Sequence, residues 1–146
     1  MSYLDMCIAD IHRALVEKIV TPLELAKEAL QRAKENKENA FETICEKEAL
    51  EFAATLVEPE ADNMLWGIPY VAKDNFSTKG IETTASSNIL NGYVPLFDAT
   101  VVAKLKEKKA VLIAKTTLDE LAMGGSGTTG HKGITYNPYD PEHKHQ

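Results

Sequence analysis

The chain has 146 residues, a formal net charge of −6 and a hydrophobic content of 44%. Its length and apolar fraction suit one globular domain with its own core, which excludes the fibrous and disordered classes. Acidic and basic residues are interleaved along the chain and form no basic block, so the charge pattern gives no sign of a nucleic-acid surface.

Cysteine use and the N-terminal residues bear on the cellular compartment. Cys7 and Cys45 are far apart and lack zinc-ligand spacing, and two cysteines are too few for a disulfide scaffold. Asp5 and Asp10 interrupt the N-terminal stretch, which therefore resembles neither a signal peptide nor a membrane span. We expect a soluble, cytoplasmic protein with reduced thiols.

Residues 1–58 are predicted to form three packed helices. The first carries apolar residues at three- and four-residue steps, at Leu4, Cys7, Ile8, Ile11, Leu15 and Ile19. Thr21, Pro22 and Glu24 form a capping-box pattern that predicts a second helix from there to about Asn36. The second and third helices have apolar positions at Leu23, Ala26, Leu30 and Ala33, and at Ala49, Leu50, Ala53, Leu56 and Val57.

After Pro59 the helical period disappears until Asp98, and glycines and prolines indicate short strands and loops. Residues 68–73 are predicted to form a strand that ends at Lys73, with Pro69 tolerated at its start. Asp98 is expected to cap a helix that is followed directly by the apolar run 111–114.

The apolar run 111–114 is typical of a strand buried on both faces. Two strands joined by a helix form a crossover unit of a largely parallel sheet, so the predicted fold class is α/β. The predicted domain organisation is one unit over 1–146, helical over 1–58 and α/β over 59–146 with a loop-rich C-terminal end.

Residues 124–146 are rich in Gly, Thr, Asn and Pro and carry no periodic apolar set. This composition predicts an extended loop that is mobile in isolation. Loops beyond roughly 12 to 15 residues are normally closed by a further element, so the sequence reads as a fold that is cut before its end.

Lys73 is the first candidate for chemistry, because it ends an apolar strand and precedes Asp74 and Asn75. A lysine that is partly desolvated there could supply a neutral amine and activate a hydroxyl nucleophile. On spacing alone, a solvated lysine is the stronger interpretation.

The second candidate is the glycine-rich segment 123–133, whose backbone amides could hold an anion. Gly125 and Gly130 have phosphate-loop spacing, but His131 and Lys132 follow where that motif needs Lys and Ser or Thr. A flexible connector, an active-site wall and a binding module for a nucleotide or other anion therefore stay open.

Other polar residues favour plainer roles. His131, His143 and His145 are not accompanied by cysteines or paired carboxylates, so solvated histidines are more plausible than a metal site. The hydroxyl residues of the segment 83–87 are interpreted as turn formers and loop anchors.

Several stretches together resemble the amidase signature family, and within it most closely the A subunits of aspartyl/glutamyl-tRNA amidotransferases. The stretch 65–75, LWGIPYVAKDN, is similar to the lysine segment of that family. The stretches that follow it in matching order are TTASSNIL at 83–90, DATVV at 98–102, AKTTLDELAMGGS at 114–126 and YNPYD at 136–140.

The resemblance implies a Ser, cis-Ser, Lys catalytic set in which Lys73 is the lysine, supported by Asp74. It implies a glutamine pocket lined by Met123, Gly124, Gly125 and Ser126. The two serines belong to a Gly-Gly-Ser-Ser-Gly-Gly-Ser type signature that is absent from these residues. The resemblance further implies that this chain binds no metal or cofactor, and that ATP and magnesium belong to a partner subunit.

As an N-terminal fragment of such an amidotransferase, the chain would act with subunits B and C, use glutamine, and meet tRNA only indirectly. It would be inactive alone, with Lys73 left solvated because the rest of the sheet is missing. A general amidase remains an alternative within the same family, because the lysine segment is shared among enzymes that act on many amides.

Overall fold

The computed structural model describes residues 2–140 and 142. Its centre is a three-stranded sheet formed by β1 (Phe41–Ile44), β2 (Pro69–Lys73) and β3 (Val111–Thr116). The strand order is β1-β3-β2, with β3 parallel to β2 and antiparallel to β1. A small mixed sheet with helices around it confirms the predicted α/β class.

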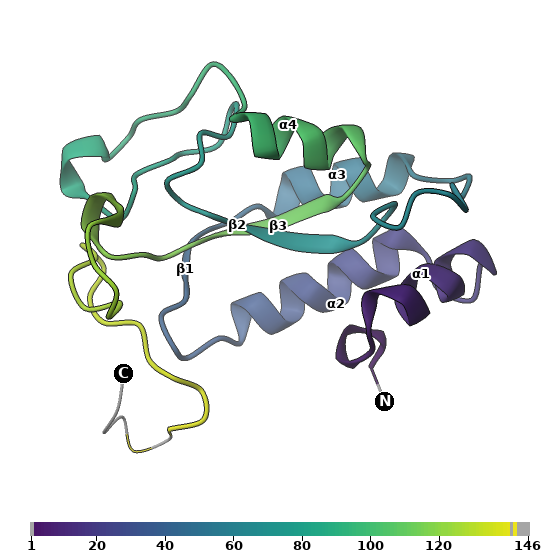
Figure 1. Cartoon of the computed structure of the whole chain (residues 1–146), viewed down its shortest axis with the longest axis horizontal. Coiled ribbons are helices and arrows are strands. Elements are labelled where there is room, and N and C mark those ends of the chain that lie inside the picture. Colours follow the sequence, from purple (N-terminus) through teal and green to yellow (C-terminus); the bar gives the residue numbers. More distant parts are fainter. Residues whose placement is uncertain (1, 141, 143–146) are drawn as a thin grey trace.

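The described residues form four α-helices around this sheet, and Figure 1 shows α4 on one side of it and α1 and α2 on the other. They are α1 (Ile8–Val16), α2 (Pro22–Lys34), α3 (Glu46–Thr55) and α4 (Thr100–Glu107), with 3-10 turns at Tyr3–Asp5, Asn88–Leu90 and Glu120–Ala122. The α3 helix packs against α2 and β3. None of the helices within the described residues is long and apolar enough to cross a membrane.

The α2 helix forms as predicted. The hydroxyl of Thr21 accepts a hydrogen bond from the Glu24 amide at 3.2 Å, and the Glu24 carboxylate accepts one from the Thr21 amide at 2.8 Å. This capping box satisfies amide groups that have no partner inside the helix. Further along α2, Leu25 and Ala26 are fully buried in the core.

The first helix is shorter than its apolar pattern indicates. It ends at Val16, and Lys18 adopts a positive φ of 56°. This left-handed residue turns the chain, as residues at helix C-termini often do, so that Val20 enters the core and Ile19 stays 61% exposed. The core between the helices and the sheet includes Ile11, Leu15, Leu25, Leu30, Ala49, Ala53, Trp66, Val111 and Ile113.

Two sequence predictions need correction. Residues 1–58 are not purely helical, because Phe41–Ile44 forms β1, whose four residues are too few to show a strand period. Asp98 does not cap α4: the N-cap residue is Ala99, without a side-chain hydrogen bond. The carboxylate of Asp98 instead accepts a hydrogen bond from the Lys79 amide at 2.7 Å, because the loop after β2 folds back onto it.

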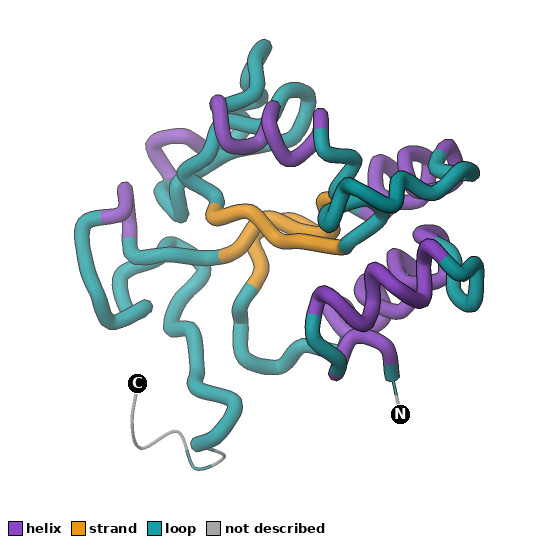
Figure 2. The backbone as a smooth tube through the Cα atoms, turned by 45° about the vertical axis from the view of Figure 1, so that its right-hand side comes forward, coloured by secondary structure: helices purple, strands orange, loops and turns teal. Residues whose placement is uncertain are grey.

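The crossover from β2 through α4 to parallel β3 is confirmed, and it decides where the loops lie. Both strands run in the same direction, so the loops after their carboxyl ends, residues 74–99 and 117–140, gather at one end of the sheet (Figures 1 and 2). The amide of Leu121 donates to the Ala85 carbonyl at 2.9 Å and joins the two loops.

Candidate functional site

Lys73 is the last residue of β2 and lies opposite Thr116 of β3. Its side chain is exposed, and its carbonyl accepts a hydrogen bond from the Phe76 amide at 3.0 Å. Among the described strands, β2 is at an edge of the sheet. The structure therefore presents Lys73 to solvent at the carboxyl end of the parallel pair, where ligands bind in sheets of this kind.

Asp74, the next residue, is completely buried and does not face solvent with Lys73. Its Oδ1 atom lies 2.9 Å from Nζ of Lys115, whose side chain is also fully buried. Its Oδ2 atom accepts hydrogen bonds from the amide and the hydroxyl of Thr84, both at 2.8 Å. The Asp74–Lys115 contact is an ion pair without the angles of a hydrogen bond, so Oδ1 has no hydrogen-bond donor among the described residues.

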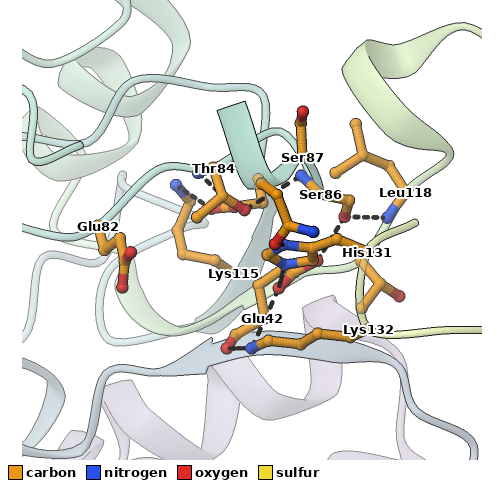
Figure 3. Close-up of polar contacts among 12 residues, drawn as sticks. Glu42, Glu82, Thr84, Ser86, Ser87, Lys115, Leu118, His131 and Lys132 are labelled. Atoms are coloured by element: carbon orange, nitrogen blue, oxygen red, sulfur yellow. Dashed lines mark hydrogen bonds and ion pairs between the residues drawn. The ribbon is translucent and has the colours of Figure 1, made fainter. Parts of the chain in front are cut away.

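The hydroxyl residues of the loop after β2 are structural anchors, as the sequence indicates. Thr84 binds Asp74, and the Ser86 hydroxyl donates to Glu42 Oε1 at 2.5 Å and accepts from the Leu118 amide at 3.0 Å. The Ser87 hydroxyl donates to Glu120 at 2.7 Å. These contacts attach the loop to β1 and to the loop after β3 (Figure 3).

Glu42 of β1 is the centre of a second buried polar group, drawn in Figure 3. Its Oε2 atom lies 3.0 Å from Nε2 of His131 and 3.1 Å from Nζ of Lys132. Burial by itself raises the pKa of Glu42, but hydrogen bonds from Ser86, His131 and Lys132 outweigh it, and the net pKa lies below the ordinary value. Glu42 is thus held as a carboxylate that fastens the C-terminal loop to the sheet.

Asp119 organises the glycine-rich segment. Its carboxylate accepts hydrogen bonds of 2.8–3.0 Å from the amides of Ser126, Gly127, Thr128 and Thr129, and from the Thr129 hydroxyl. The backbone hydrogen bonds from Gly127, Thr129 and Ser126 are the main reason why the pKa of Asp119 is well below its usual range. The segment is a loop without regular structure, as predicted, but these contacts argue against the mobility expected for it.

The glycines of this segment let the backbone approach the chain's own residues. A Cβ atom on Gly124 would lie 2.5 Å from Cγ of Asp119, and one on Gly130 would lie 2.8 Å from the Leu118 carbonyl oxygen. Larger residues there would displace the loop. The residues assigned to the glutamine pocket, Met123, Gly124, Gly125 and Ser126, are all exposed, and Met123 is 83% exposed.

Backbone strain is concentrated where the two loops meet. Ala85 and Ser86 have a φ of 50° each, and Leu121 and Ala122 have φ values of 54° and 61°. Such left-handed conformations are unfavourable for residues other than glycine, by about 1–3 kcal/mol each, and they cluster at functional sites. The strained pairs touch through the hydrogen bond from the Leu121 amide to the Ala85 carbonyl.

No group of three or more potential metal ligands occurs within residues 2–140 and 142. His131 is occupied by Glu42 and by Oδ1 of Asn88, which lies 3.0 Å from its Nδ1. His143 and His145, which the sequence analysis weighed as metal ligands, lie outside the described residues.

A separate cavity of about 420 Å³ lies between α3 and α4 above the sheet. Phe52, Tyr70 and Val102 contribute to its apolar lining, and neither Lys73 nor the glycine-rich segment reaches it. Burial, with a smaller effect of Asp98, raises the pKa of Tyr70 to about 12, so this hydroxyl stays protonated. The cavity is therefore separate from the candidate site.

Sequence reasoning missed Lys115, Glu42 and Asp119 as organisers of the site. One signal was available for Lys115, which follows the apolar run 111–114 on a strand that was expected to be buried on both faces. A charged residue in such a position needs a buried partner. For Glu42 and Asp119 no local pattern gave a signal, since their partners lie on distant segments or in an irregular loop.

Comparison with known proteins places this architecture in a family. Residues 24–145 match the family model described as Amidase. The chain is 45% identical over 144 residues to the A subunit of glutamyl-tRNA(Gln) amidotransferase from Streptococcus pneumoniae (strain Hungary19A-6), and also to that from Streptococcus thermophilus (strain CNRZ 1066). These alignments cover 96% of this chain and 30% of each relative, so the chain spans about 30% of the length of these curated relatives.

Solved structures agree with the sequence matches. A structure described as "Crystal structure of amidase" has a TM-score of 0.80 and 34% identity, over 93% of this chain and 32% of that one. The A subunit of glutamyl-tRNA(Gln) amidotransferase from Thermotoga maritima has a TM-score of 0.76 and 33% identity, over 95% of this chain and 28% of that one. Both the sequence and the fold match members of one family over most of the chain, and the chain belongs to the amidase family.

Proposed function

We propose that this chain is the N-terminal part of a single amidase-signature domain in the glutamine-hydrolysing A subunit of a tRNA amidotransferase. The domain supplies ammonia for the amidation of misacylated Glu-tRNA(Gln) or Asp-tRNA(Asn). Lys73 is the lysine of its Ser, cis-Ser, Lys set. The observation that carries the proposal is the exposed Lys73 at the carboxyl end of β2, above a buried polar network that joins the loops after β2 and β3.

In this reaction the neutral amine of Lys73 accepts a proton through the cis-serine from the nucleophilic serine. The nucleophile attacks the side-chain amide carbon of glutamine, ammonia leaves, and water hydrolyses the acyl-enzyme to glutamate. Backbone amides beside the nucleophile stabilise the oxyanion. Residues 123–126 form a wall of the glutamine pocket, which fits their exposure next to the loop that Asp119 holds.

Other parts of the complex carry out the remaining steps of the reaction. Neither serine lies in residues 1–146, so these residues alone are inactive. Subunits B and C are the partners, and one of them uses ATP and magnesium to amidate the tRNA. The assembly is a cytoplasmic carbon–nitrogen ligase, and this chain meets tRNA only indirectly.

The sequence left two alternatives open, a general amidase and an anion-binding module. A general amidase uses the same lysine, and a peptide amidase is among the similar solved structures, with a TM-score of 0.82 and 30% identity, covering 94% of this chain and 31% of that one. An anion-binding module on Gly124–Gly133 is disfavoured, because the amides of residues 126–129 already bind the carboxylate of Asp119.

A glutaminase assay tests the proposal. Residues 1–146 should release no ammonia from glutamine, and a gene that continues into a glycine- and serine-rich signature should encode an active chain. In that longer chain, Lys73→Ala should reduce the glutaminase rate by about 10²–10⁴-fold, the usual contribution of a general base. Lys79→Ala, on an exposed lysine of the same loop, is the matched control and should keep the rate.

Glutamine hydrolysis by residues 1–146 that depends on Lys73 would contradict the proposed serine nucleophile. Faster hydrolysis of simple amides or peptide amides than of glutamine by the longer chain would favour the general amidase. Calorimetric titration of residues 1–146 with ATP should show no binding, and binding there would revive the anion-binding module.

A further inference from the structure

Lys115 carries a buried charge that the proposed chemistry does not use. Its side chain and that of Asp74 are both 0% exposed. The Lys115 ammonium lies 2.9 Å from Asp74 Oδ1 and donates to the Phe76 carbonyl at 3.1 Å and to the Thr83 hydroxyl at 3.0 Å. The ammonium thus makes two hydrogen bonds, to Phe76 and Thr83, and Asp74 supplies the opposite charge.

These contacts surround the peptide that follows Lys73. The Asp74 amide donates to the Thr116 carbonyl at 3.0 Å, and the Asp74 carbonyl accepts from the Ala85 amide at 3.1 Å. Asp74 is therefore held by β3 through its backbone and by Lys115 and Thr84 through its side chain. Because Lys73 is the neighbouring residue, the same contacts fix the backbone from which its side chain extends.

Stability alone is a poor reason for such a pair. Removing two charges from water is unfavourable, and a well-packed apolar pair of similar size often replaces a buried ion pair without loss of stability. An apolar pair, however, would not hold the Thr83, Thr84 and Phe76 backbone and hydroxyl groups through directed contacts. The ion pair therefore fixes the positions of these groups, which an apolar pair would not do.

The pair also has an electrostatic consequence for Lys73. A carboxylate close to an amine favours the charged ammonium form, which cannot accept a proton. Asp74 follows Lys73 in the chain but is buried while Lys73 is exposed, and the positive charge of Lys115, 2.9 Å from Oδ1, offsets its charge. A lysine that serves as a base needs the neutral form, which a nearby uncompensated carboxylate would disfavour.

We propose that Lys115 is a positioning residue for Lys73: its ion pair with Asp74 fixes the backbone that carries Lys73 and offsets the charge of the carboxylate on the next residue. This inference rests on the proposed role of Lys73 as a base. It assigns to Lys115 no contact with substrate. It predicts that the two members of the pair affect the reactivity of the Lys73 amine in opposite directions.

Competitive acetylation of residues 1–146 tests the inference without any substrate. A trace of acetic anhydride at one pH and ionic strength modifies neutral amines, and mass spectrometry of peptides gives the rate at Lys73 relative to the exposed Lys27 of α2. Lys115→Met leaves the Asp74 carboxylate unpaired. The acetylation rate of Lys73 should then fall by about two- to fivefold, the effect of one unit charge across a largely aqueous path. Asp74→Asn leaves the Lys115 ammonium unpaired and should raise the acetylation rate of Lys73 by a similar factor.

The double variant Asp74→Asn/Lys115→Met removes both charges and should return Lys73 to the wild-type rate. Shifts of both single variants in the same direction, or no shift in samples with wild-type circular dichroism, would overturn the inference. If Lys115→Met does not fold, the comparison of Asp74→Asn with the double variant still decides, and equal rates in these two would overturn it. The assay is independent of glutamine hydrolysis, so a failed glutaminase assay and a failed acetylation pattern are separate results.

Discussion

Two regions of this molecule are held together by different forces. The layer of α1 and α2 is stabilised by apolar side chains such as Leu15, Leu25 and Leu30, which are at most 3% exposed. The loops after β2 and β3 are held by buried polar groups instead, centred on Asp74, Glu42 and Asp119.

The difference has a physical consequence for function. Apolar burial is non-directional and tolerates small shifts, which suits a layer that only has to support the sheet. Polar networks are directional and lose much of their value when one member is missing, which suits loops that must hold Lys73 and residues 123–126 in fixed positions. Substitutions in each region can separate these two kinds of stabilisation.

The Asp74–Lys115 pair should be the most sensitive point of the loop region. Lys115→Met leaves a buried carboxylate without its counter-charge and should lower the free energy of unfolding by about 3–5 kcal/mol. Urea unfolding measures this loss. The double variant Asp74→Asn/Lys115→Met should lose clearly less, and equal losses in the single and double variants would show that the charge itself does not matter here.

Leu25 tests the apolar layer in the same assay. Its side chain is fully buried in the hydrophobic core, and Leu25→Ala should lower the free energy of unfolding by about 2–5 kcal/mol through lost burial and a cavity. Leu23→Ala is the matched control on the same helix, because Leu23 is only partly buried, and it should cost less. A larger loss for Leu23 would mean that α2 packs in another orientation.

Acid should weaken the loop region more than the apolar layer. Glu42 and Asp119 both have pKa values below those of free carboxyl groups, so the unfolded chain binds protons at a higher pH than the folded chain does. Their stabilisation is complete above the unfolded value of about 4 and is lost as the pH falls through the lower folded values.

Urea midpoints at pH 6 and pH 3 check this dependence. Glu42→Gln and Asp119→Asn should each show a smaller drop between the two pH values than the wild type does. Glu17→Gln, on an exposed residue after α1, should leave the drop unchanged. A wild-type drop that neither site variant reduces would assign acid sensitivity to other carboxylates.

The capping box of α2 should give the smallest effect. Thr21→Ala removes the acceptor of the Glu24 amide and should cost about 1 kcal/mol. Thr21→Ser keeps the hydroxyl and should cost less. Because the cap is local to the helical layer, neither change should alter the acetylation rate of Lys73, and a change there would show that the two regions are coupled.

Local sequence signals predicted much of the scaffold. The capping box at Thr21 and Glu24, the strand that ends at Lys73 and the crossover to the run 111–114 all depend on neighbouring residues, and all are confirmed. The short β1 strand was missed because its pairing partner, β3, lies about 70 residues further along the chain. Asp98 was misread as a cap because its partner, the Lys79 amide, comes from a loop without a pattern.

Residue spacing over short distances was enough to predict the helices, the parallel pair of strands and the family resemblance around Lys73. The surroundings of Lys73, in contrast, come from the fold. It brings Lys115 from β3 to Asp74 and closes residues 126–129 on Asp119, and it places His131 on Glu42. The physical reason is that a buried charge takes its partner from whichever segment the fold brings within about 3–4 Å, and sequence spacing carries no record of that distance.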